Sequence, residues 1–163
     1  DELSIALKEG FLQRNFQGYS TYADCDLVAI GVSSIGKIGS TYSQNERDID
    51  AYYAALDAGH LPIMRGYQLN QDDILRRNII QDLMCRFSLD YRIYESVFGI
   101  PFSRYFAAEL EDMKQLETLG LVRLKPHSLT VTPKGRFLIR NIAMVFDYHL
   151  RHKETKAKYS QTV

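Results

Sequence analysis

The sequence has 163 residues, of which 45% are hydrophobic, and its 20 basic and 20 acidic side chains cancel to a formal net charge of zero. This composition allows one sizeable core or two small ones and excludes an intrinsically disordered chain. The neutral balance provides no overall field to attract nucleic acid, and no apolar run approaches the roughly 20 residues of a membrane span. We therefore expect neither a nucleic-acid partner nor a membrane span.

The beginning of the chain predicts a helix end followed by a strand. Residues 1–10 have an amphipathic pattern that ends at Gly10, as helices often do. A chain that starts inside such a segment indicates a piece of a longer protein. A short strand is predicted over residues 14–18.

The apolar run over residues 27–32 predicts a strand buried on both faces, because no polar residue alternates with the apolar ones. Such strands are typical of parallel sheets in α/β folds, where ligands bind at the carboxyl ends. The glycine-containing loop over residues 31–39 is therefore the first place to look for function. Residues 43–45 offer an N-cap for a helix that reaches Gly59, and residues 63–69 are expected to be extended.

The second half of the chain predicts long amphipathic helices. Asn70 and Asp73 form a capping-box-like start for a helix of about 17 residues. The later expected elements are a helix over 91–98, a third helix capped by Ser103, short strands over 121–124 and 129–131, and a last helix starting at Thr132-Pro133. The last helix is expected to bury Phe137, Leu138, Ile142, Val145 and Phe146. This order indicates a winged-helix-like plan.

A phosphate-loop pattern is nearly present. Residues 31–37 match G-x-x-x-x-G-K, but Ile38 stands where Ser or Thr must bind magnesium. Gly39-Ser40 also interrupts the helix that should begin there. Nucleotide hydrolysis is therefore disfavoured, and we prefer a ligand held by exposed backbone amides.

The winged-helix-like plan raises nucleic-acid binding as an alternative. Its third helix carries only Arg104 and Lys114 as bases, among several acidic residues that would repel phosphate. We favour a packing or lid module.

Other candidate groups favour ordinary structural roles. The pair Arg76-Arg77 is interpreted mainly as part of a solvated face, although Arg65 and this pair could each hold a carboxylate. The two cysteines, Cys25 and Cys85, are expected to be reduced thiols of a cytoplasmic protein rather than a disulfide. The histidines form no ligand set, and the tyrosines are expected to pack.

Several motifs together closely resemble the oxygen-independent coproporphyrinogen III oxidase family, also called coproporphyrinogen dehydrogenase. They are RNFQGYST (14–21), DCDL (24–27), GVSSI (31–35), YSQN (42–45), RGYQL (65–69), LMCRFSLDY (83–91), LTVTPKGR (129–136) and RNIAMVFD (140–147). The resemblance covers essentially the whole chain, but only the carboxyl-terminal third of such an enzyme.

The resemblance implies a radical S-adenosylmethionine enzyme that oxidatively decarboxylates two propionates of coproporphyrinogen III to vinyl groups, giving protoporphyrinogen IX for haem synthesis. It implies two bound S-adenosylmethionine molecules and a 4Fe-4S cluster on a C-x-x-x-C-x-x-C loop. This chain lacks that loop and contains only two cysteines, so the fragment alone is expected to be inactive. The parent enzyme is expected to be a monomer.

The resemblance also implies site residues. Phe16, Gln17 and Ile35 fall on the family's cofactor contacts, where Gln17 can hydrogen-bond polar groups and the other two can make apolar contacts. Arg65 is a candidate for binding a substrate carboxylate. No catalytic residue and no metal ligand is assigned.

The expected fold is α+β or α/β. Residues 1–67 would form the terminal strands of a partial α/β barrel, and residues 68–163 a mostly helical lid domain with a small β-hairpin. Three alternatives stay open, namely a nucleic-acid-binding module, a bare interaction module and a haem-chaperone-like paralogue.

Overall fold

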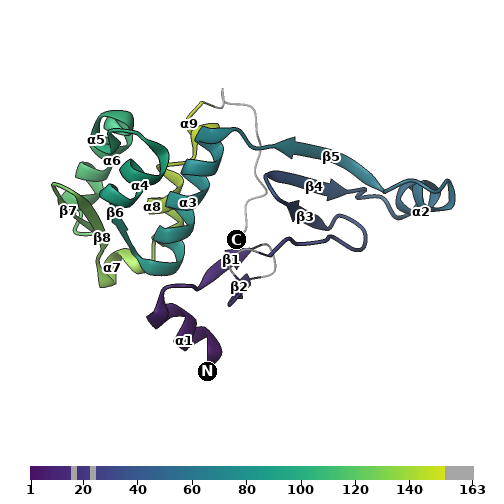
Figure 1. Cartoon of the computed structure of the whole chain (residues 1–163), viewed down its shortest axis with the longest axis horizontal. Coiled ribbons are helices and arrows are strands. Elements are labelled where there is room, and N and C mark those ends of the chain that lie inside the picture. Colours follow the sequence, from purple (N-terminus) through teal and green to yellow (C-terminus); the bar gives the residue numbers. More distant parts are fainter. Residues whose placement is uncertain (16–17, 23–24, 153–163) are drawn as a thin grey trace. The chain divides into compact units, whose positions relative to one another are not determined.

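The structure is a computed structural model that describes residues 1–15, 18–22 and 25–152. It mixes helices and strands, which confirms the expected α+β class (Figure 1). The chain divides into two compact units, Asp1–Ile74 and Leu75–Val163. Within the described ranges, no helix has both the length and the hydropathy that a bilayer crossing requires.

The first unit is built from short strands with one helix at its start and one between strands. Its elements are α1 (Glu2–Glu9), β1 (Gln13–Asn15), β2 (Gly18–Ser20), β3 (Ile35–Ile38), β4 (Thr41–Asn45), α2 (Ile49–Asp57) and β5 (Ile63–Gln68). β1 pairs with β2, and β3, β4 and β5 form a sheet in that order, with every pair antiparallel. The predicted end of α1 at Gly10, which is left-handed at φ 82°, is confirmed. The extended segment predicted over residues 63–69 is present as β5, which ends at Gln68.

The strand predicted over residues 27–32 is wrong. Only Leu27 pairs, through an isolated bridge to Lys37, while Val28 and Ile30 are 68% and 84% exposed. The carbonyls of Ala29 and Gly31 accept from the side-chain amide of Asn45, at 3.4 and 2.9 Å, instead of from the backbone amides of a neighbouring strand.

The glycine loop predicted over residues 31–39 is wrong in its second half, where Ile35–Ile38 is strand β3. A β-carbon at Gly36 would lie 3.0 Å from the Leu27 carbonyl oxygen, so glycine permits a close backbone approach there. The N-cap expected within residues 43–45 is also wrong. Those residues belong to β4, and Asp48 caps α2 by accepting from the Ala51 amide at 2.9 Å.

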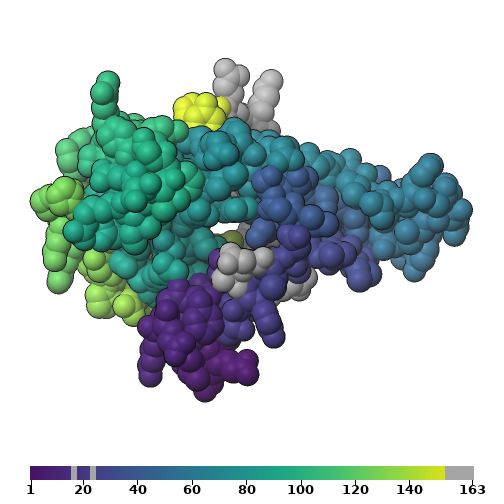
Figure 2. All heavy atoms as spheres, in the orientation of Figure 1, coloured from purple at the N-terminus to yellow at the C-terminus, as the bar shows by residue number. Residues whose placement is uncertain are grey.

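Helix α2 connects β4 to β5 and has no buried residue. Figure 2 shows it standing out from the sheet that carries it.

The second unit is mostly helical. With α3 (Gln71–Arg86), which begins in the first unit, its elements are β6 (Ser88–Asp90), α4 (Tyr91–Phe98), α5 (Phe102–Tyr105), α6 (Ala107–Thr118), β7 (Val122–Lys125), β8 (Ser128–Val131), α7 (Pro133–Arg136), α8 (Ile139–Met144) and α9 (Tyr148–Arg151). The sheet order is β6-β8-β7, all antiparallel. The two predicted strands are confirmed, and β6 is an addition. The winged-helix comparison stays a prediction.

Two of the three local capping signals predicted over residues 70–103 are confirmed. The Asp73 amide donates to Asn70 Oδ1 at 2.9 Å and the Asn70 amide to Asp73 Oδ2 at 3.1 Å, which confirms the capping box. Gly99 ends α4 in the left-handed region at φ 65°. Ser103, in contrast, lies inside α5, and α6 starts after Phe106 without a side-chain cap.

The last predicted helix is broken into α7, α8 and α9. Thr132 caps its start as expected, accepting from the Gly135 amide at 3.0 Å. The break after Arg136 changes the helical register, so Phe137 is 91% and Leu138 is 45% exposed, contrary to prediction. Ile142 and Phe146 are buried as predicted.

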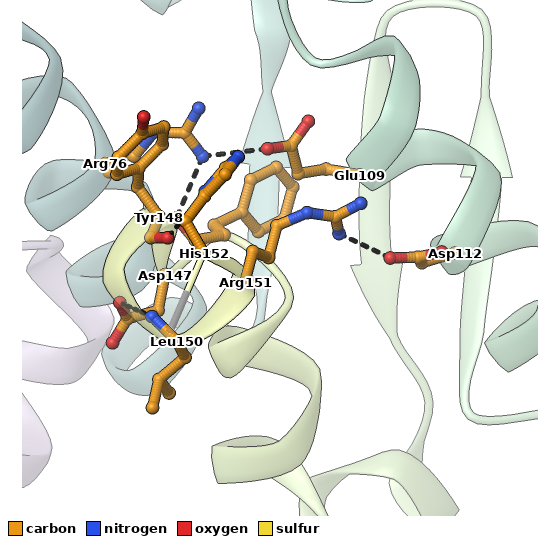
Figure 3. Close-up of polar contacts among 9 residues, drawn as sticks. Arg76, Glu109, Asp112, Asp147, Tyr148, Leu150, Arg151 and His152 are labelled. Atoms are coloured by element: carbon orange, nitrogen blue, oxygen red, sulfur yellow. Dashed lines mark hydrogen bonds and ion pairs between the residues drawn. The ribbon is translucent and has the colours of Figure 1, made fainter. Parts of the chain in front are cut away.

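The core of the second unit contains a buried ion pair. Arg76 is only 9% exposed, and its Nη1 lies 2.8 Å from Glu109 Oε1 and donates to the Phe146 carbonyl at 3.1 Å (Figure 3). Its guanidinium also lies over the rings of Phe106 and Tyr148, at 5.0 and 5.4 Å. The interpretation of Arg76 as part of a solvated face is therefore wrong. Its carboxylate partner, Glu109, is distant in sequence, so the sequence alone did not indicate the pair.

Candidate functional site

One face of the β3-β4-β5 sheet brings two of the predicted site residues into a single row. Ile35 pairs with Gln44, and Gln44 pairs with Arg65. Residues directly opposite one another in antiparallel strands project from the same face of a sheet. Ile35, Gln44 and Arg65 therefore share one face, which we call the site face.

The middle residue of this row connects its neighbours. Arg65 Nε donates to Gln44 Oε1 at 2.9 Å, and Gln44 Nε2 donates to the Ser33 carbonyl at 3.2 Å. The amide thus orients the guanidinium through one nitrogen and leaves the two terminal nitrogens for another acceptor. Ile35 is half-buried and supplies an apolar contact at the end of the row.

A second row of the site face lies two residues further along the strands. It consists of Lys37, Tyr42 and Tyr67, which are paired in register across the three strands. The Tyr67 hydroxyl donates to Asp73 Oδ2 at 2.9 Å, and this hydrogen bond to a carboxylate raises the pKa of Tyr67. Tyr67 therefore acts as a hydrogen-bond donor to Asp73.

The loop that leads into β3 is fixed by the chain itself. The buried Asn45 side chain holds the Gly31 carbonyl, and the Gly31 amide donates to the Tyr52 hydroxyl at 3.1 Å. The amides of Ser33 and Gly39 donate to Glu46 O and Asp26 Oδ1, both at 2.7 Å. The expectation that exposed amides of this loop bind a ligand is therefore wrong for these positions, because the chain already supplies their acceptors.

The phosphate-loop pattern does not form a phosphate site. Lys37 lies in strand β3 and is followed by a turn and strand β4, and not by a helix. A P-loop requires the helix amides that would face the phosphate.

The predicted site residues are only partly located. Phe16 and Gln17 lie outside the described residues. Ile35 and Arg65 are brought together, one on each side of Gln44. Sequence reasoning missed Gln44 and Lys37 as members of this face. Gln44 belongs to the YSQN motif and Lys37 to the phosphate-loop pattern, but neither pattern predicts the strand register.

The described residues do not fit an iron-sulfur cluster. Cys25 is exposed and Cys85 is buried, neither forms a disulfide, and no group of three or more His, Cys, Asp or Glu side chains in the described ranges could hold a metal ion. Cluster ligation takes three or four convergent thiolates. The site face suits another ligand, because a guanidinium, an ammonium and an amide beside an apolar side chain can hold a carboxylate and its hydrocarbon.

Comparisons with known proteins agree on one relationship. Residues 69–138 match the family model described as HemN C-terminal domain. A curated relative from Pseudomonas aeruginosa, named oxygen-independent coproporphyrinogen III oxidase, is 48% identical over 92% of this chain and 33% of its own length. Relatives with the same name from Synechocystis and Escherichia coli are 44% and 43% identical, and each alignment covers 100% of this chain and 36% of the relative.

A solved structure supports the same relationship. It is described as coproporphyrinogen III oxidase (HemN) from Escherichia coli, a radical SAM enzyme, and it matches with a TM-score of 0.88 and 44% identity. The match covers 91% of this chain and 34% of that chain. The present chain therefore spans about a third of the length of the curated relatives it matches.

Proposed function

We propose that this chain, which carries a HemN C-terminal domain and corresponds to about a third of an oxygen-independent coproporphyrinogen III oxidase, is part of such an enzyme. The enzyme would oxidatively decarboxylate two propionates of coproporphyrinogen III to vinyl groups, giving protoporphyrinogen IX in haem biosynthesis. The observation that carries this proposal is the identity of 43% over the whole chain to a relative with that name.

The solved structure described as a radical SAM enzyme supports the cofactors that we propose. S-adenosylmethionine, when bound, would supply the radical chemistry, with two molecules present in the parent enzyme. The 4Fe-4S cluster would be held by the remainder of the parent chain, because only two cysteines occur here. The fragment alone would be inactive, and the parent would be a cytoplasmic monomer.

The residues of this chain would bind and position ligands. Ile35, Phe16 and Gln17 would each contact the cofactor, Ile35 through its apolar side chain, and Arg65 would bind a carboxylate through the guanidinium nitrogens that Gln44 leaves available. Two observations support this assignment. Ile35 presents a half-buried apolar side chain, and the Gln44 side-chain amide on the paired strand orients Arg65. Residues 1–67 would belong to the barrel and residues 68–163 to a domain that shields the reaction from solvent.

The alternatives have less support. The helix that would read DNA, α6, uses Glu109 in a buried ion pair and pairs Lys114 with Glu111 at 2.7 Å, so it offers little positive charge for phosphate. The relatives cited above carry the name of the oxidase, which supports the enzyme over a haem-chaperone-like paralogue.

A substitution at Gln17 tests the cofactor assignment. In the full-length protein, Gln17→Ala should weaken S-adenosylmethionine binding about tenfold or more, because a buried polar cofactor group would lose its hydrogen-bond partner. Equilibrium dialysis with labelled cofactor measures binding, and porphyrin product formation measures turnover. Gln13→Ala, in strand β1, is the matched control and should change neither. Unchanged binding and turnover in Gln17→Ala would remove Gln17 from the site.

A further inference from the structure

The site face carries a second cation, Lys37, in addition to Arg65. Lys37 projects from the same side of the sheet as Arg65. Successive residues of a strand project from opposite faces, and the rows of Lys37 and Arg65 lie on either side of the row that contains Gly36. Lys37 is half-buried and Arg65 is exposed. Like charges on one face repel each other, so the arrangement favours an anionic ligand.

Neither cation is neutralised within the part of the chain that the structure describes. Arg65 makes one side-chain hydrogen bond there, to the neutral amide of Gln44, and no ion pair. The Lys37 ammonium has no ion-pair or hydrogen-bond partner among the same residues. Asp73, the carboxylate that reaches this face, instead accepts from the Tyr67 hydroxyl and the Asn70 amide.

The spacing of the two cations favours two separate carboxylates over one. The residues are two positions apart along the strands and two strands apart across the sheet. Strand geometry makes these offsets about 7 Å and about 10 Å, so their Cα atoms are on the order of 12 Å apart. S-adenosylmethionine has a single carboxylate, whereas a coproporphyrinogen carries several propionates around one macrocycle.

We infer that Lys37 and Arg65 bind two propionate carboxylates of one porphyrinogen, with Lys37 as a binding residue in addition to Arg65. This inference rests on the proposed function. Tyr42, which lies between the two cations, would face the macrocycle. Lys37 would act as a binding residue and would take no part in the chemistry.

The test uses the full-length protein and two ligands. Binding of coproporphyrin III is followed by its fluorescence, and binding of S-adenosylmethionine by equilibrium dialysis. Lys37→Met should weaken coproporphyrin binding about tenfold, the effect of losing one charge-assisted hydrogen bond, and should leave cofactor binding unchanged. Lys37→Arg should restore binding to within about threefold, because the charge is kept. Arg47→Met removes one exposed charge from the same unit outside the sheet and should have no effect.

The outcomes separate the inference from the proposed function. If Lys37→Met binds both ligands like the unchanged protein, the inference is wrong. If it loses affinity for S-adenosylmethionine instead, the carboxylate belongs to the cofactor and the propionate assignment is wrong. If the unchanged protein binds neither ligand, the proposed function itself fails.

Discussion

Arg76→Met should destabilise the protein by about 3 to 5 kcal/mol, the usual effect of removing one partner of a buried ion pair. The substitution leaves the Glu109 carboxylate, in a residue only 5% exposed, without its cation. It also removes the donor to the Phe146 carbonyl and the guanidinium that lies 5.4 Å from the Tyr148 ring (Figure 3). Urea unfolding followed by circular dichroism measures the change.

Two further variants define the cause of this effect. Lys114→Met breaks the exposed pair with Glu111, whose side chains are 64% and 66% exposed, and should change stability by less than about 1 kcal/mol. The double variant Arg76→Met, Glu109→Leu removes both charges and should recover most of the lost stability. A loss below about 1 kcal/mol in Arg76→Met would contradict the importance of the pair.

Gly135→Ala should have an effect of similar size. A β-carbon at this position would lie 2.0 Å from the Leu121 carbonyl oxygen and 2.9 Å from Val131 Cγ1, so backbone would have to move. The move would disturb the Thr132 cap, whose Oγ1 donates to the Gly120 carbonyl at 2.8 Å. We expect a loss of about 3 kcal/mol or more, at the upper end for overpacking.

Gly66→Ala is the matched control for this substitution. Its added β-carbon would meet the Tyr42 carbonyl oxygen at 3.5 Å, an ordinary contact, in an exposed strand. Its stability should therefore change by no more than about 1 kcal/mol. If Gly135→Ala unfolds at the same urea concentration as the unchanged protein, the close approach of Gly135 to the Leu121 carbonyl oxygen is wrong.

Short-range signals in the sequence predicted much of the fold. The capping box at Asn70 and Asp73, the Thr132 cap and the glycine stop at Gly99 depend on residues within a few positions of each other. Such signals are readable because the donor and acceptor are close in the chain.

The errors arose where distant residues decide the structure. The run over 27–32 contains strand-forming residues. The carbonyls of Ala29 and Gly31, however, accept hydrogen bonds from the Asn45 side chain and not from the backbone of a paired strand. Arg76 could not be recognised as buried without knowing that Glu109 approaches it from another helix.

The candidate site shows the same division. Residue types and the family resemblance suggested Ile35 and Arg65 as site residues, which stays a prediction, but the strand register could not be deduced from the sequence. The register depends on a tight turn after Ile38 and on a connection that includes α2 between β4 and β5. Only this register shows that Gln44 stands between Ile35 and Arg65 and that Lys37 shares their face.

The most direct measurement of the central claim is the turnover of coproporphyrinogen III by the full-length protein under anaerobic conditions, with the cluster reconstituted and with S-adenosylmethionine and a reductant supplied. We predict conversion to protoporphyrinogen IX with release of two carboxyl groups as carbon dioxide. An absence of decarboxylation by cluster-loaded, cofactor-bound protein, while the Escherichia coli relative is active in the same assay, would contradict the claim.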